Sequence, residues 1–113
     1  MWVMLTDSFL SVVEDTNHPG NLLVRARAEG DIEKVFPGAV VFTTPSGDYG
    51  WRTSLDRMTV KEAMVNEVGR IDYSNFKNAT PEDDRHNAYL KCWVAMVEFQ
   101  AGRQVRTKRK KRK

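Results

Sequence analysis

The sequence predicts an α+β fold in which a mostly antiparallel sheet of four to five strands is covered on one face by two to three helices. A length of 113 residues, with 41% hydrophobic and 29% charged residues, fits one soluble domain with one modest core. Short apolar runs separated by turn residues fill the first half of the chain. Two segments with helix-start signals follow in the second half.

Three strands are predicted at the start of the chain. The apolar runs Trp2 to Leu5 and Phe9 to Glu14 are separated by three short polar residues, which favour a turn and predict a hairpin. From Leu22 to Arg27, apolar residues occupy every second position. Because side chains alternate across a strand, this pattern predicts a third strand with one buried face.

A short helix and a second hairpin are predicted next. Apolar residues at positions 32, 35 and 36 have helical spacing, Asp31 can cap this helix, and Pro37 with Gly38 ends it. Residues 39–44 and 49–55 are rich in β-branched and aromatic residues, and they flank a Pro-Ser-Gly-Asp turn. We therefore expect these two segments to pair as a hairpin.

Two longer helices are predicted in the second half. Thr59 and Glu62 have the spacing of a capping box. The expected core face of this helix consists of Val60, Ala63, Met64, Val68 and Ile71. In the last helix Thr80 is expected as the cap, Pro81 takes the first position, and Gly102 is expected as the stop. The expected core stripe consists of Tyr89, Cys92, Trp93, Met96 and Phe99.

The resulting order is β-β-β-α-β-β-α-α, which favours helices layered on an antiparallel sheet. Residues 22–71 match part of a ferredoxin-like unit. The sequence predicts a single α+β domain over residues 1–102.

Residues 103–113 differ from this domain in charge. They contain eight of the eighteen Lys and Arg residues and no acid, whereas residues 1–102 contain ten basic and fifteen acidic side chains, a net charge of −5. Like charges repel and bury no apolar surface, so a disordered basic tail is predicted. Its cations are Arg103, Arg106, Lys108, Arg109, Lys110, Lys111, Arg112 and Lys113.

A cationic tail can release counterions from a polyanion, which predicts salt-sensitive contact with nucleic acid or a nucleoprotein. Three other interpretations of the tail fit the same charge pattern: a solubilising end, an intramolecular partner for the acidic domain, or an expression remnant.

Several classes of protein are excluded by composition. Cys92 is the single cysteine, so neither an internal disulfide nor a zinc site with several cysteines is expected. No stretch approaches the length of a membrane span, and the first residues do not resemble a signal peptide, which predicts a cytoplasmic protein with no membrane contact. No cofactor and no metal site are predicted.

Catalytic signals are weak. Asp83 and His86 are spaced to share a helix face, which is half of a general-base arrangement, but no nucleophile accompanies them and a surface histidine has the same pattern. Gly47 and Gly50 precede a strand and not a helix, so they predict a hairpin turn and not a phosphate-binding loop.

Residues 71–78, between the two helices, form the first candidate binding site. Aromatic, amide and cationic side chains can together stack on a base and bind its edge. The alternative is that the aromatics pack inward and the Asn side chains make turn hydrogen bonds. The candidate residues, including two at the start of the last helix, are Tyr73, Asn75, Phe76, Lys77, Arg85 and His86.

A second candidate site consists of Arg25, Arg27 and Arg52. If their strands are neighbours, the three guanidinium groups gather on the sheet face opposite the helices, where they can bind phosphates or carboxylates. A solvated sheet face has the same pattern.

The chain resembles a family of small proteins of bacteria and their phages that has no established function. The resemblance covers about residues 1–99 and implies a prokaryotic or phage origin without implying an activity. It is carried by Met1 to Met4, Phe9 to Val13, Leu22 to Arg27, Ile71 to Lys77 and Arg85 to Trp93.

Three functions are compatible with these patterns. The first is a non-enzymatic module that recognises a nucleic acid, a nucleoprotein or another protein, with added affinity from the tail; an inhibitor of a host nucleic-acid machine belongs to this class. The second is a small-ligand or nucleotide-binding protein that uses the 71–89 region. The third is a structural or oligomeric protein, suggested by Tyr49 and Trp51 on one strand.

Overall fold

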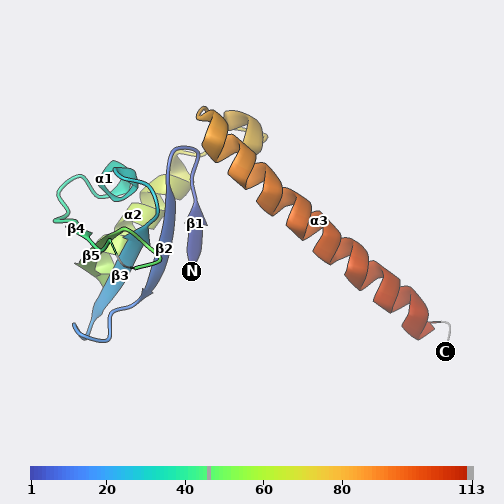
Figure 1. Ribbon diagram of the computed structural model, residues 1–113, viewed down its shortest axis with the longest axis horizontal. Helices are drawn as coiled ribbons and strands as arrows, with labels where there is room; N and C mark the ends of the chain where they lie inside the picture. The colour runs from blue at the N-terminus through green and yellow to red at the C-terminus, as the bar shows by residue number, and fades with distance from the viewer. Residues whose placement is uncertain (46, 112–113) are drawn as a thin grey trace. The chain divides into compact units, whose positions relative to one another are not determined.

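The computed structural model describes residues 1–45 and 47–111 (Figure 1). The chain divides into two compact units, Met1–Ser74 (unit 1) and Asn75–Lys113 (unit 2). Unit 1 contains β1 (Trp2–Met4), β2 (Phe9–Glu14), β3 (Asn21–Ala26), α1 (Asp31–Val35), β4 (Phe42–Thr43), β5 (Trp51–Asp56) and α2 (Arg57–Gly69). Unit 2 contains a 3₁₀ turn, η1 (Lys77–Ala79), and α3 (Asp83–Lys111).

Unit 1 is a five-stranded antiparallel sheet of order β1-β2-β3-β5-β4 with two helices, which confirms the predicted α+β class. Both predicted hairpins are present, β1 with β2 and β4 with β5. A ferredoxin-like topology is not confirmed, because within the described residues no strand follows α2 to complete a second β-α-β half.

The core lies between one face of the sheet and the two helices of unit 1. Alternate residues of β2 and β3 project into it, which confirms the buried face that the period-two pattern predicted for β3. Helix α1 is followed by Phe36, which packs with Ile32 into this core, and α2 contributes Val60. Because both helices reach the same cluster, they cover the same sheet face. The buried members of the core are Leu10, Val12, Val24, Ala26, Ile32, Phe36 and Val60.

The N-terminal caps of the first two helices differ from the prediction. Asp31 does not cap α1, because Gly30 occupies the cap position and the Asp31 carboxylate instead accepts the Phe9 N–H at 3.0 Å. Helix α2 begins at Asp56 and not at Thr59. The Asp56 carboxylate accepts the Thr59 hydroxyl at 2.6 Å and the Thr59 N–H at 3.2 Å. These two bonds, in that order, lower the pKa of Asp56.

The predicted core face of α2 is wrong at its end. Val60 is buried and Ala63 and Met64 are partly buried, but Val68 and Ile71 are exposed. At 100° per residue, Val68 lies about 80° away from Val60 around the helix. Ile71 has the right phase but follows the last helical residue.

Strand β4 is shorter than the predicted strand 39–44. Only two residues pair with β5, with Phe42 opposite Arg52 and Thr43 opposite Trp51. The Val40 carbonyl instead accepts the Thr53 hydroxyl at 2.9 Å. The following turn was predicted over residues 45–48, of which Ser46 lies outside the described residues.

Unit 2 corrects both predicted ends of the last helix. Thr80 does not cap α3, because its hydroxyl donates back to the Phe76 carbonyl at 3.2 Å and the helix begins at Asp83. Gly102 does not end α3, which continues to Lys111. The basic segment is therefore helical as far as Lys111, where the sequence predicted a disordered tail, and Arg112 and Lys113 lie outside the described residues.

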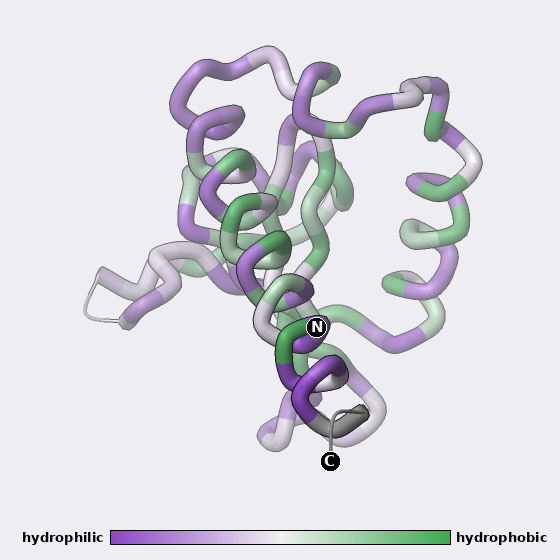
Figure 2. The backbone as a smooth tube through the Cα atoms, turned by 90° about the vertical axis from the view of Figure 1, so that its right-hand side faces the viewer, coloured by the Kyte–Doolittle hydropathy of each residue, from purple (hydrophilic) through white to green (hydrophobic). Residues whose placement is uncertain are grey.

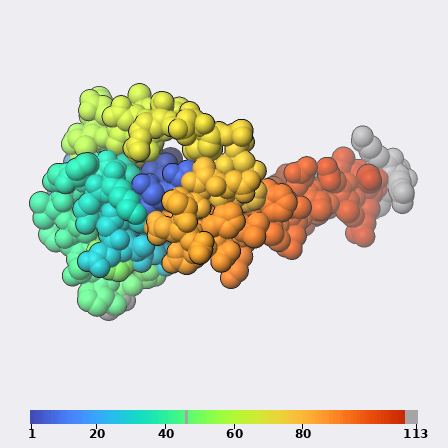
Figure 3. Space-filling view, turned by 90° about the horizontal axis from the view of Figure 1, so that it is seen from above, coloured from blue at the N-terminus to red at the C-terminus, as the bar shows by residue number. Residues whose placement is uncertain are grey.

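The continuation of α3 has a physical explanation. Lys, Arg and Gln are good helix formers, and cations near a helix C-terminus interact favourably with the helix dipole. A Gly in a helix interior costs about 1 kcal/mol without ending the helix by itself. Hydrophobic and hydrophilic residues alternate along α3 (Figure 2), which occupies the orange to red part of Figure 3. Within the described residues, none of the helices combines the length and hydrophobicity that a membrane crossing needs.

Candidate functional site

The open face of the sheet carries a row of residues that crosses all five strands. The pairing register places Trp2 opposite Ser11, Ser11 opposite Arg25, Arg25 opposite Arg52, and Arg52 opposite Phe42. Directly paired residues of antiparallel strands project to the same side. Their strand neighbour Val24 projects into the core, so the row lies on the face opposite α1 and α2. We call these five residues the cross-strand row.

Two arginines from β3 and its end contact one tyrosine. The Arg25 guanidinium lies 4.5 Å and that of Arg27 4.1 Å from the centre of the Tyr49 ring, in cation–π geometry. Arg25 also donates to the Ser11 hydroxyl at 2.8 Å, and Arg27 to the Asp48 carbonyl at 2.7 Å. These contacts hold the guanidinium groups against the sheet and bury Tyr49.

Two donors at the centre of the row are unused within the described residues. The Nε atoms of Arg25 and Arg52 are buried and have no hydrogen-bond partner. Buried polar groups in folded proteins almost always have partners, so such an exception calls for an explanation. The two Nε atoms are themselves shielded from solvent, but Arg25 and Arg52 are partly exposed as whole residues, and two cations on directly paired residues are complementary to an anion.

The turn between β4 and β5 is shaped to fit this site. A Cβ atom on Gly47 would lie 3.1 Å from Nη2 of Arg52, which is tighter than ordinary contact. Thr44 fixes the turn, because its N–H donates to the Gly50 carbonyl and its hydroxyl to the Tyr49 carbonyl, both at 2.8 Å. Gly47 was predicted to belong to a hairpin turn, and its small size also admits the Arg52 side chain.

The two ends of the cross-strand row are exposed aromatics. Trp2 is 69% exposed and Phe42 is 60% exposed. At about 4.8 Å per strand, the four spacings between their strands amount to about 19 Å. Among strand residues on this face, Asp56 is the acidic one, and its carboxylate is engaged in capping α2. The face therefore combines aromatic ends with a cationic centre.

The three arginines of the second candidate site are thus brought together as the sequence predicted: β3 and β5 are neighbours, and Arg25 and Arg52 are directly paired. Sequence reasoning missed Trp2 and Phe42 as members of the same face. Their place on this face follows from the register of all five strands, which the sequence alone does not reveal.

The residues of the first candidate site are distributed over both units. Tyr73 belongs to unit 1, and the others belong to unit 2. Phe76 stacks on Tyr89 with ring centroids 5.2 Å apart, and the Asn75 side chain accepts the Asn78 N–H at 3.1 Å. These contacts match the alternative of inward packing and turn hydrogen bonds.

The cationic members of that site also have contacts within unit 2. Lys77 Nζ lies 5.1 Å from the centre of the Trp93 ring. Nδ1 of His86 lies 2.7 Å from the Lys77 carbonyl, which makes it a donor there and not a partner of Asp83. Arg85 Nε donates to Glu82 at 3.2 Å. These contacts therefore give a local structural role to this region.

A polar network at the β2–β3 turn was not predicted. Buried Asp15 accepts the Ser54 hydroxyl at 2.6 Å and lies 3.0 Å from Nδ1 of His18, while Asn21 donates to Ser54 at 3.1 Å. The Ser54 hydroxyl bond first, and then the Asn17 N–H and His18, lower the pKa of Asp15 against the effect of burial. Ser54 is 39 residues away from Asp15, so no local pattern could indicate this network.

This network contains a serine, a histidine and a carboxylate, but it lacks the geometry of a catalytic triad. In a triad the serine hydroxyl donates to histidine, and the carboxylate orients the other ring nitrogen. Here the Ser54 hydroxyl donates to the carboxylate itself. The network therefore fixes the turn between β2 and β3 and joins it to β5.

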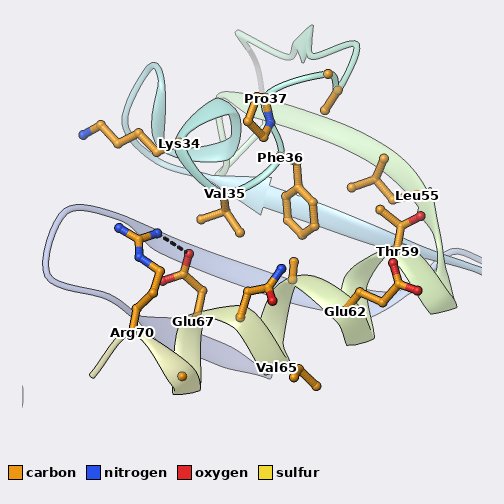
Figure 4. A pocket seen from close by; sticks show the side chains of 15 residues that line it. Lys34, Val35, Phe36, Pro37, Leu55, Thr59, Glu62, Val65, Glu67 and Arg70 are labelled. Carbon is orange, nitrogen blue, oxygen red and sulfur yellow. Dashed lines mark hydrogen bonds and ion pairs between the residues drawn. The ribbon is translucent and has the colours of Figure 1, made fainter. Parts of the chain in front are cut away.

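A shallow groove lies between α1 and α2 (Figure 4). Val35, Phe36 and Leu55 form its apolar part, and the ion pair of Glu67 with Arg70, at 3.1 Å, lies at its rim. Because the ion pair at its rim is already engaged within α2 and the end of that helix, the groove offers less chemistry than the open face of the sheet. Among the described residues, no group of three or more His, Cys, Asp or Glu is placed to hold a metal ion.

Comparison with known proteins adds no further assignment. No protein-family model matches the chain, and neither a curated protein nor a solved structure matches it significantly. The resemblance noted from the sequence therefore stays a prediction, and the candidate site depends on its geometry alone.

Proposed function

We propose that the protein is a non-enzymatic module that binds single-stranded nucleic acid on the open face of its sheet. The observation that carries this proposal is the cross-strand row, in which two partly exposed arginines lie between two exposed aromatics. Aromatic platforms beside cations are the usual means of binding single strands without strong sequence preference.

Each part of the row has a distinct role in the proposal. Trp2 and Phe42 offer ring faces on which bases stack. Arg25 and Arg52 bind phosphate oxygens between them, because a guanidinium group presents several N–H donors in a fixed geometry. Tyr49 holds Arg25 in place and does not need to contact the ligand.

The basic end of α3 adds sequence-independent affinity. Residues 103–113 carry eight cations and no acid. A cationic segment releases counterions from a polyanion, so its contribution decreases as salt increases. We further propose a cytoplasmic location, where a nucleic acid or a nucleoprotein is accessible as partner.

The test is a fluorescence anisotropy titration of labelled single-stranded DNA and RNA oligonucleotides with the full chain. Removing a stacking ring costs about 1–3 kcal/mol per base, which is about 5- to 150-fold in affinity. We expect Trp2→Ala and Phe42→Ala each to weaken binding within this range. Met58→Ala, which removes an exposed apolar side chain from α2, is the matched control and should leave binding unchanged.

The contribution of the α3 end is measured separately by deleting residues 103–113. The logarithm of affinity against the logarithm of salt has a slope of about −0.7 per phosphate neutralised on a single strand. We expect the deletion to reduce this slope, while the losses caused by Trp2→Ala remain. Unchanged affinity in every sheet variant would refute the proposed role of the sheet face, and an unchanged slope would refute the role of the basic end.

A further inference from the structure

Helix α3 exposes an apolar surface that unit 2 does not cover. Between 38% and 61% of each of its large apolar side chains from position 90 to position 99 is exposed. These side chains are Leu90, Trp93, Val94, Met96, Val97 and Phe99. Contiguous exposed apolar surface on a protein usually marks an interaction site.

The most regular part of this surface is a stripe along one side of the helix. Leu90, Val94, Val97 and Ala101 recur at intervals of four, three and four residues, which is the spacing of a helix seam. At 100° per residue, Cys92 and Phe99 lie opposite this stripe, and Ala95 lies about 130° from its centre. We call the four-residue set the α3 seam.

A helix with an exposed apolar face gains stability when that face is packed. The 29 residues of α3 correspond to about 43 Å of helix. Most of the stability of helices in proteins comes from packing of their apolar face rather than from helix propensity. The α3 seam therefore calls for a partner that is itself long and apolar on one side.

The charges of α3 indicate which partner fits. The helix starts with Asp83 and Asp84, directly after Glu82, and ends in a run of cations from Arg103 onward. A second copy in parallel orientation would place the cationic ends together. An antiparallel copy places each acidic start beside a cationic end, and such complementarity selects orientation in paired helices.

We propose that α3 pairs with α3 of a second copy as an antiparallel, two-fold symmetric helix pair. A pair centred on Met96 puts Asp83 level with Arg109, and Asp84 level with Lys108. In the same register Val94 lies about 1.5 Å along the axis from Val97 of the second copy, so the two α3 seams meet near the centre. A two-fold interface uses the same patch on both copies, which the α3 seam provides.

This pairing does not require nucleic acid. It also leaves part of the positive charge of α3 free to bind a nucleic acid. Glu82, Asp83 and Asp84 are three carboxylates, whereas residues 103–113 carry eight cations. The surplus of positive charge at each end of the pair remains available to a polyanion. The dimer would form without nucleic acid, so failure of one proposal can be distinguished from failure of the other.

Sedimentation equilibrium of the full chain without nucleic acid tests the pairing. We expect a dimer, and we expect Val97→Glu to raise the dimer dissociation constant at least about tenfold, because it places a charge in the apolar seam. Ala95→Glu adds the same charge away from the α3 seam and should leave the constant nearly unchanged. A monomer at all concentrations, or equal effects of both variants, would overturn the proposal.

Disulfide cross-linking tests the orientation, with Cys92→Ser as the background in each case. In the antiparallel register, residues at position 97 of the two copies are about 3 Å apart along the axis, whereas those at position 90 are about 18 Å apart. We expect air oxidation to link Val97→Cys and not Leu90→Cys. A parallel pair would bring both positions level, so efficient linking of Leu90→Cys would overturn the antiparallel orientation.

Discussion

In unit 1 the side chains of Leu10, Val24 and Ile32 are fully buried, whereas in unit 2 those of Trp93 and Phe99 are more than half exposed. Both units contain large apolar side chains, but the units differ in how far these side chains are buried. The sheet and its two helices enclose buried apolar residues of β2 and β3, while within unit 2 the long helix α3 packs against the segment around η1. Unit 1 is therefore built around its own core, whereas α3 carries the exposed apolar side chains on which the proposed pairing depends.

The two units also differ in charge. Unit 1 has seven basic and eleven acidic side chains, and unit 2 has eleven basic and four acidic ones. Under the proposed function, long-range attraction to a polyanion would therefore come from unit 2. The arginines of unit 1 would act at short range, on a face where the carboxylates of Asp15 and Asp56 are engaged in hydrogen bonds within unit 1. Net charge alone would have assigned no nucleic-acid contact to unit 1.

The largest effect expected from this comparison concerns the core of unit 1. Ile32 is fully buried and Ile71 is 54% exposed, so the same substitution can be made in both environments. We expect Ile32→Ala to lower the free energy of unfolding by about 2–5 kcal/mol, since it removes buried methyl groups and leaves a cavity. The measurement is urea denaturation followed by tryptophan fluorescence.

Ile71→Ala is the matched control and should change the free energy of unfolding by less than about 1 kcal/mol. A similar loss in both variants would show that the exposed residues at the end of α2 are packed in solution. The contrast between enclosed and exposed apolar residues would then be weaker than described above.

The next effect concerns the helical basic segment. Gly102 lies inside α3 and no atom from elsewhere in the described chain approaches the position of its missing Cβ. Pro in a helix interior costs about 3 kcal/mol relative to Ala, and Gly about 1 kcal/mol. We expect Gly102→Pro to abolish helix beyond residue 102 and Gly102→Ala to strengthen it, measured by circular dichroism at 222 nm and by amide hydrogen exchange of residues 103–109.

Equal circular dichroism for the native chain and Gly102→Pro would contradict the continuous helix. It would restore the unstructured tail that the charge pattern predicts, and it would leave α3 without the cationic end on which the antiparallel register depends.

The core of unit 1 was largely predictable from local patterns. Alternation along residues 22–27 gave the buried face of β3, and turn residues gave both hairpins. Helix boundaries were predicted less well, because several residues can cap one start. Asp56 and Thr59 are both capping types, and only the direction of the chain leaving β5 selects Asp56.

The end of α3 could not be predicted for a different reason. Charge repulsion and the glycine both favoured a stop at Gly102, while helix propensity and the helix dipole favoured continuation, and these opposing terms are each about 1 kcal/mol. The candidate site was predicted in part. The common face of the three arginines could be predicted from the alternation of side chains within their strands. The position of Trp2 and Phe42 on the same face could not, because it depends on the strand order, which is determined by contacts between residues far apart in sequence.

The smallest expected effect concerns how the polar network of unit 1 responds to acid. The pKa of Asp15 is lowered from its ordinary value of 3.8, chiefly by the Ser54 hydroxyl. A lowered pKa means that this carboxylate stabilises the fold above about pH 4 and that its contribution is lost as pH falls through the lowered pKa. We expect Ser54→Ala to raise the pKa of Asp15 toward 3.8, as measured by NMR titration, and to reduce the acid-dependent part of the stability. Ser54→Thr keeps the hydroxyl and should preserve the lowered pKa, so a similar rise in both variants would mean that the Asn17 N–H and His18, and not the Ser54 hydroxyl, determine the pKa of this group.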